Sequence, residues 1–200
     1  MAYPNGQEIW DYLMAEFNNA YGVAGLMGNL YAESGLYPFR LQGDMDYEHF
    51  FPVSHEYAAD VNDGTISEYT FVHDSKGFGL AQWTYYTRKQ ELYDFTVVQH
   101  YGVDNLNRQL EFLCLEIVRD FPTVEYALLH ATSVREASDI VLTDFENPAD
   151  QSEAVKVQRA NYGIDIYNTY SGQPPVPPIP PVPPVPTGRK MPLYMYLRRL

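Results

Sequence analysis

The sequence predicts a mainly α-helical fold, and three observations lead to this prediction. Apolar residues recur at three- and four-residue steps through most of the first 170 positions, which is typical of helices that bury one face. Glycine and proline punctuate these stretches at points where helices would end. A proline repeat at 174–186 then marks a change to a segment that forms neither helix nor sheet.

The first two helices follow from apolar spacing. A helix over about 6–19 would place Ile9, Leu13 and Phe17 on one face, and a second over about 22–34 ends its apolar stripe at Glu33. Small residues on the second helix would allow close packing against neighbouring helices. They are Gly22, Ala24, Gly25 and Gly28.

Helical spacing is lost between residues 35 and 77. This stretch is rich in Asp, Tyr, His and Phe, and it predicts a long loop or small β region, with short strands near 69–72. Loops of this length over a rigid core often line a binding cleft.

Capping signals predict the remaining helices. Thr87 with Gln90 resembles a capping box that opens a helix to about His100. Asp104 would cap the next helix, and Ser133 with Glu136 forms another capping box. A last helix is expected over about 151–169.

The chain divides into three parts. Residues 1–172 form the expected globular domain, 173–187 a proline-rich linker, and 188–200 a basic, aromatic tail. The repeat at 174–186 predicts polyproline II, which at ~3.1 Å per residue would hold the tail up to roughly 40 Å from the domain.

Charge excludes a nucleic-acid binder. The net charge is −13, and phosphate contacts require clustered Lys and Arg. The tail carries four basic residues and no acidic ones, so residues 1–172 hold 9 basic against all 26 acidic residues, a charge of −17. An acidic domain therefore precedes a basic tail.

The single cysteine and the N-terminus limit the compartment. Cys114 lies mid-stripe in LEFLCLEIV, which predicts a small core residue and not a nucleophile. The start MAYPNGQEIW lacks the features of a signal peptide, and no apolar run is long enough to span a membrane. We expect a product made in the cytoplasm, without a membrane span.

Glu33 is the first candidate for chemistry. It lies at the end of an apolar stripe, followed by Gly35 and Pro38, which terminate helices. The negative end of the helix dipole and apolar neighbours such as Leu30 and Leu36 favour a protonated carboxyl group. Such a group can protonate a glycosidic oxygen, although many helix-end glutamates are surface residues.

The second candidate is the segment GFGLAQWT at residues 77–84. Its glycines let a backbone approach a ligand, Gln82 offers a donor and an acceptor, and Trp83 offers an aromatic face. A tight turn before a helix explains the same spacing.

Together these segments resemble a known family. Glu-Ser followed by Gly-x-Gly-Leu-x-Gln is similar to the signature of goose-type lysozymes and lytic transglycosylases. The segments GNLYAESGLYP, GFGLAQWTYYTRK and REASDIVLTDFENPADQSEAVKVQRA resemble phage tail lysozymes over roughly residues 6–170. The resemblance implies a two-lobed lysozyme-like fold whose cleft binds peptidoglycan, and it leaves the tail unexplained.

The resemblance also implies roles for single residues. Glu33 matches the catalytic acid, Ser34 the residue beside it, and Gln82 a residue that contacts sugar substituents. Further substrate-contact candidates are Gly79, Trp83, Tyr31, Tyr85 and Glu146. Core packing is an equal alternative for the three aromatic residues, and structural bracing is an equal alternative for Glu146. Glu146 stands in DFENP, where Asn147 replaces the Arg of some family members, so a role built on that Arg is in doubt.

A second catalytic carboxylate is not identified by the sequence. Hydrolysis needs a nucleophile or a base, whereas a transglycosylase uses the substrate's own 6-hydroxyl group. The candidates in the intervening segment are Asp44, Asp46, Glu48, Asp63, Glu68 and Asp74. Hydrolysis and transglycosylation both stay open.

The leading prediction is a phage muramidase that needs no cofactor or metal. The five histidines form no HExxH motif, which disfavours a zinc amidase. The alternatives are an amidase or endopeptidase of the stem peptide, and a non-catalytic wall-binding virion protein. The expected partner is peptidoglycan, reached after release by the lysis machinery or carriage in the virion, and the tail is expected to contact wall polymers or virion proteins.

Overall fold

The structure is a computed structural model that describes residues 3–44 and 51–183. Its helices, in chain order, are α1 (Gly6–Phe17), α2 (Ala20–Ser34), α3 (Pro52–Asp63), α4 (Glu68–His73), α5 (Tyr86–Phe95), α6 (Leu106–Asp120), α7 (Pro122–His130), α8 (Val134–Ile140), the π-helix η1 (Val141–Glu146) and α9 (Glu153–Tyr170). The mainly helical fold is therefore confirmed for the described residues. None of their helices is long and apolar enough to cross a membrane.

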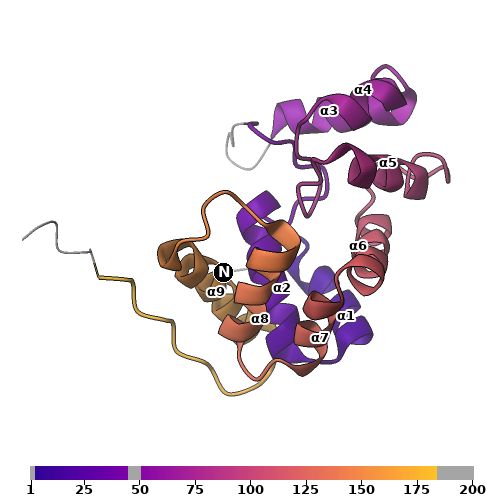
Figure 1. Ribbon diagram of the computed structural model, residues 1–200. Coiled ribbons are helices and arrows are strands. Elements are labelled where there is room, and N and C mark those ends of the chain that lie inside the picture. The colour runs from indigo at the N-terminus through magenta and orange to yellow at the C-terminus, as the bar shows by residue number, and fades with distance from the viewer. Residues whose placement is uncertain (1–2, 45–50, 184–200) are drawn as a thin grey trace, which may run out of the picture.

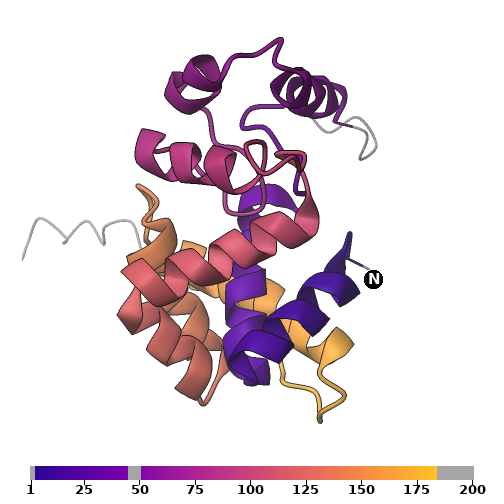
Figure 2. The same cartoon turned by 90° about the vertical axis from the view of Figure 1, so that its right-hand side faces the viewer.

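Helix α2 lies at the centre of the lower bundle, where it packs against α1, α7, α8 and α9 (Figures 1 and 2). Its small residues make this possible, as the sequence predicts. A Cβ atom on Gly28 would lie 2.6 Å from the carbonyl oxygen of Arg159, and one on Gly25 would lie 2.6 Å from the Cβ of Ala137. This close approach brings the α9 side chains to the end of α2 that carries Glu33.

Helices α3, α4 and α5 form an upper group above the bundle, joined to it through α6 (Figures 1 and 2). The strands predicted near 69–72 are wrong, because these residues belong to α4. Ser67 caps this helix by accepting a hydrogen bond from the amide of Thr70, and the helix buries Phe71 and Val72. A second part of the predicted loop is also helical, since α3 buries Tyr57, Ala58 and Val61 along one side.

One of the predicted helix starts differs from the structure. Helix α5 begins at Tyr86, and Tyr85 precedes it without a side-chain cap, so the Thr87 capping box is wrong. Gln90 instead donates to Glu68 and Asp94.

Two other capping predictions are close to what the structure contains. Asn105, one residue after the predicted Asp104, caps α6 by accepting from the amide of Arg108. Ser133 caps α8 as predicted, while the carboxylate of Glu136 accepts from Thr132 and not from Ser133.

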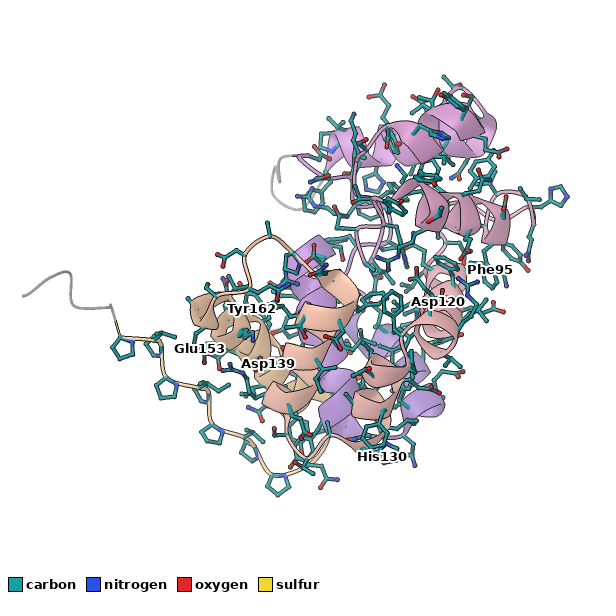
Figure 3. The ribbon with its side chains drawn as sticks, viewed as in Figure 1. Phe95, Asp120, His130, Asp139, Glu153 and Tyr162 are labelled. Atoms are coloured by element: carbon teal, nitrogen blue, oxygen red, sulfur yellow. The ribbon has the colours of Figure 1, made fainter. Side chains whose placement is uncertain are left out.

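Helices α8 and α9 are fastened by an ion-pair network. Arg135 contacts Asp139 at 2.7 Å and Glu153 at 2.9 Å, and Figure 3 labels both acidic side chains. The network joins α8 to the first turn of α9. Cys114 is a buried free thiol, as predicted, and burial raises its pKa to about 12.

Beyond α9, the proline-rich segment lies against the domain. Val176 and Ile179 each exchange two hydrogen bonds with an asparagine of α9: Asn168 with the backbone of Val176 at 2.8 and 2.9 Å, and Asn161 with that of Ile179 at 2.7 and 3.0 Å. We call residues 174–183 the strap. Figure 1 shows it as the yellow trace that turns back beside the bundle.

The strap matches α9 in spacing. Two asparagines seven residues apart share a helix face about 10 Å apart, and three residues of polyproline II advance about 9 Å. The first part of the predicted linker is therefore anchored on the domain. The predicted tail, 188–200, lies outside the described residues.

Candidate active site

The residues expected to carry chemistry meet at a cavity of about 440 Å³ between the bundle and the upper helices. Both acidic and basic side chains contribute to its wall, together with the glycine-rich turn. The lining residues are Glu33, Arg40, Gln42, Gly43, Ala81, Gln82, Thr84, Tyr85, Arg88, Glu146 and Pro148. Segments distant in sequence therefore form one polar site.

Glu33 reaches the cavity from the last turn of α2. The helix ends because Gly35 adopts a left-handed conformation, φ 67°, and donates its amide to Tyr31. The buried hydroxyl of Ser34 donates to the carbonyl of Leu30 and accepts from the amide of Leu36. Ser34 thus holds the turn beneath Glu33, and it is absent from the cavity lining.

The carboxylate of Glu33 forms an ion pair with α9. Its Oε1 lies 2.6 Å from Nη2 of Arg159, and the two side chains are 21% and 11% exposed. Arg159 also donates to the buried Asn29 of α2. Sequence reasoning expected apolar neighbours around Glu33 and missed Arg159, although Arg159 lies within a segment that carries the family resemblance. The arginine provides a permanent counter-charge for an ionised Glu33.

Glu146 is the second carboxyl group of the cavity. It ends the π-helix η1, after which Asn147 adopts a left-handed conformation and donates its amide to Leu142. Its Oε1 is closed to solvent and has no hydrogen-bond partner. Burial, and then the nearby charge of Glu33, raise the pKa of Glu146 to about 8, against the opposing effects of Arg88 and Arg159. Glu146 therefore keeps a proton at neutral pH.

Two arginines face these carboxyl groups from the upper side. Arg88 is held by Glu116, 2.8 Å from Nη2 to Oε2, and stacks over the ring of Phe145 at 4.7 Å. Arg40 lies over the ring of Phe51 at 4.0 Å, and its buried Nη1 has no partner. The cavity thus combines an unpaired donor with an unpaired carboxyl oxygen, which is unusual for buried polar atoms.

The glycine-rich turn forms another part of the wall. Phe78 and Trp83 pair their backbones in an isolated bridge, and Phe78 forms a second with Leu41, in place of the predicted β region. Gln82 adopts φ 46°, and its amide nitrogen donates to the carbonyls of Arg40 and Gly79, both at 3.0 Å. Gln82 therefore braces the turn while it lines the cavity.

Of the predicted substrate-contact residues, Gln82, Tyr85 and Glu146 join Glu33 in the cavity lining. Trp83 is fully buried, and its indole donates to Glu116 at 3.0 Å. Gly79, also buried, lies against Gln109 and takes φ 78°. Tyr31 contacts the rings of Tyr3 and Tyr162. These three positions support the site without lining its cavity.

The predicted second carboxylates are occupied elsewhere. Asp74 pairs with the buried Lys89, Asp44 accepts from Ser54, Asp63 accepts from Thr65, and Glu68 accepts from Gln90. Asp46 and Glu48 lie outside the described residues. Among the described carboxyl groups, Glu146 is the one that shares the cavity lining with Glu33.

The fold and this site define a helical protein with a two-carboxyl polar cavity, an arrangement suited to glycosidic bond cleavage. The chain matches the family described as phage tail lysozyme over residues 4–170, and it belongs to that family. Family membership indicates a lysozyme-like enzyme that degrades peptidoglycan. A search of curated proteins found no match.

Proposed function

We propose that this protein hydrolyses the β-1,4 bond between N-acetylmuramic acid and N-acetylglucosamine, with Glu33 as the general acid. The observation that carries the proposal is the pair of carboxyl groups, Glu33 and Glu146, lining one polar cavity. Glycosidases of this kind need one carboxyl group to protonate the leaving oxygen and another to act on the sugar or on water.

The pair holds one proton near neutral pH, because the pKa of Glu146 is raised to about 8 and Glu33 is paired with Arg159. When two interacting groups share a cavity, the proton belongs to the pair and not to one residue. We assign its delivery to Glu33, whose side chain is 21% exposed, whereas Oε1 of Glu146 is closed to solvent.

The chemical steps then follow. Glu33 protonates the glycosidic oxygen, the bond to the muramic acid anomeric carbon breaks, and positive charge develops on that sugar ring. The proton that Glu146 holds in the resting pair passes to Glu33 before this step, so that Glu146 is ionised and stabilises the positive charge, while Arg159 stabilises the carboxylate left on Glu33. A water molecule adds to the anomeric carbon and returns its proton to Glu33. The second carboxyl group favours hydrolysis over transglycosylation, which does not require one.

Mass spectrometry of digested peptidoglycan tests this function. We expect muropeptides with intact peptide stems and reducing muramic acid ends, each product gaining the mass of one water. Anhydro-muramic acid ends would instead identify a transglycosylase. Release of free stem peptides would identify an amidase, and unchanged walls would indicate a non-catalytic virion protein. Each of these outcomes contradicts the proposal.

We also propose that the protein is phage-encoded and acts during host lysis or wall penetration, with the C-terminal tail as an attachment segment. The family match and the basic character of residues 188–200 support this. Attachment through charge should weaken as salt rises. Binding of the full chain and of a chain ending at Thr187 to purified walls, compared at low and high salt, tests it. Equal binding by both chains would contradict the role of the tail.

A further inference from the structure

Exposed aromatic side chains gather on the upper helices, beginning at the edge of the cavity. Tyr69 is 73% exposed, Tyr86 is 50% exposed and Tyr85 is 62% exposed, and His73 between them is also exposed. Exposed apolar groups that cluster, and are not scattered singly, often mark a binding surface. We call these four residues the ring row.

The ring row is continuous from one residue to the next. The rings of Tyr69 and His73 stack with centroids 4.3 Å apart, those of His73 and Tyr86 with centroids 6.0 Å apart, and Tyr86 contacts Tyr85 at 4.9 Å. Tyr85 in turn lines the cavity. The row therefore leads from the wall of the candidate active site out along the surface.

The framework beneath the row is firmly held. Helices α4 and α5 are joined by the ion pair between Lys89 and Asp74, 2.5 Å long, in which the lysine side chain is fully buried. Gln90 of α5 also donates to Glu68 of α4 at 2.9 Å. Because both helices are fixed to each other, the rings keep their spacing without a ligand.

A second tyrosine–histidine pair shows what local helix structure alone produces. Tyr126 and His130 of α7 stack at 4.3 Å, and each histidine Nδ1 lies 2.9 Å from the carbonyl oxygen of its tyrosine. The α7 pair contacts no further ring among the described aromatic contacts, and Figure 3 places His130 at the lower end of the molecule, far from α4. The connection to the cavity thus distinguishes the ring row.

We propose that the ring row binds the glycan strand where it leaves the cavity, as a sugar-binding surface that extends the site. This inference rests on the proposed function. Sugar rings combine an apolar face with hydroxyl groups at the edge, and tyrosine offers a matching aromatic face and a phenolic hydroxyl group. Contact with the row would add affinity for long strands, while bond cleavage in short fragments would not depend on it.

Binding to insoluble peptidoglycan, measured by co-sedimentation in a Glu33→Gln background, tests the proposal. We expect the double variant Tyr69→Ala/Tyr86→Ala to bind about tenfold more weakly, because it loses two aromatic faces. Tyr126→Ala is the matched control and should bind like its parent. Tyr69→Phe/Tyr86→Phe should retain most of the binding, because it keeps the rings.

In the catalytically intact chain, the double alanine variant should cleave short soluble fragments at the parental rate and long strands with a higher KM. The proposal would be overturned if the double alanine variant bound walls as well as Tyr126→Ala does, whether both bind like the parent or both bind more weakly by the same factor. Failure of the proposed function would look different, because the parent itself would then not cleave the glycan. Circular dichroism confirms that each variant is folded.

Discussion

The strap and the cavity differ in whether their polar groups are hydrogen-bonded within the chain. On the strap, the backbone amides and carbonyls of Val176 and Ile179 are all paired with asparagine side chains. In the cavity, Oε1 of Glu146 and Nη1 of Arg40 are closed to solvent and have no partner. One region satisfies its hydrogen bonds within the chain, and the other leaves them open.

This difference separates stability from function. A buried polar atom without a partner costs about 1–3 kcal/mol, so the cavity lowers the free energy of unfolding. The paired amides of the strap add stability, because the chain has few other donors in a proline-rich stretch. The residues that carry these unpaired atoms, Glu146 and Arg40, line a cavity that a substrate can enter, whereas the polar groups of the strap are already bound. Variants in the two regions should therefore have different consequences.

The largest expected effect is in the cavity. Glu33→Gln nearly preserves shape but removes the proton donor, and general acid catalysis contributes about 10²–10⁴-fold to rate. We expect the rate of wall lysis, measured as loss of turbidity, to fall by about 10²-fold or more. The far-UV circular dichroism spectrum should be unchanged. Glu125→Gln, at a half-buried site on α7 that does not line the cavity, is the control. Lysis within tenfold of the parent by a folded Glu33→Gln protein would remove Glu33 from the mechanism.

Glu146→Gln should reduce activity while it increases stability. The folded-state pKa of Glu146, about 8, exceeds the usual value of 4.5, so the folded protein binds a proton more tightly than the unfolded chain. The contribution of Glu146 to the free energy of unfolding is therefore complete below about pH 4.5 and is lost as the pH rises towards 8. We expect cleavage to fall roughly tenfold or more, and the melting temperature to rise relative to the parent more at pH 8 than at pH 5.

The effect of Glu146→Gln on stability is measured by thermal unfolding of the parent and of the variant between pH 5 and pH 8. An equal difference in melting temperature at every pH would show that Glu146 is not held protonated in the folded protein.

On the strap, the expected effect is on stability alone. Asn161→Ala/Asn168→Ala removes four hydrogen bonds that are exposed or half-buried. A hydrogen bond contributes about 0.5–1.5 kcal/mol net, and we expect these four to lie near the lower end of that range. We expect a loss of about 1–3 kcal/mol and a melting temperature lower by several degrees. Cleavage of soluble fragments should be unchanged. Gln158→Ala on the same helix is the control.

Truncation at Gly172 should reproduce the loss of stability, because it removes the strap itself. If either change abolished cleavage of soluble fragments, the strap would belong to the catalytic machinery and the comparison would fail.

Gln82 contributes both to stability and to the cavity wall, and its substitution should have the smallest effect of the changes considered. Gln82→Ala loses the two amide hydrogen bonds and keeps the left-handed backbone strain of about 1–2 kcal/mol that Gln82 itself bears at φ 46°. Gln82→Gly loses the same bonds without that strain. Both variants should bind chitin-like oligosaccharides more weakly, with the alanine variant also the less stable. Parental binding by both would exclude Gln82 from substrate contact.

The helices of the bundle could be predicted because their stripes are periodic. Ile9, Leu13 and Phe17 are buried on α1 as expected, and Gly35 ends α2. The upper helices α3 and α4 could not be predicted, because their short apolar stripes are interrupted by Tyr, His and Asp. These segments are helical because helix formation packs Tyr57 and Phe71 into the core. Local propensity is a weak guide where tertiary contacts decide.

Both carboxyl groups of the cavity stand in motifs of the family resemblance, which names Glu33 as the acid and Glu146 only as a substrate contact. Glu33 stands at a recognisable helix end within a resembling motif. The pairing of Glu33 with Arg159, and the placement of Glu146 in the same cavity, depend on close packing of α2 with α9 and on a π-helix. No local spacing in the sequence encodes either contact. The predicted partner was sought in the segment nearest to Glu33, whereas the fold supplies it from a distant one.

The pH dependence of kcat/KM tests the shared proton of Glu33 and Glu146 most directly. The parent, assayed on soluble glycan fragments, should lose activity as the pH rises through about 8, where the pair loses its proton. In Glu146→Gln, which has no such group, the residual activity should no longer decline as the pH rises through about 8. A basic limb at the same pH in parent and variant would contradict a proton held between these two residues.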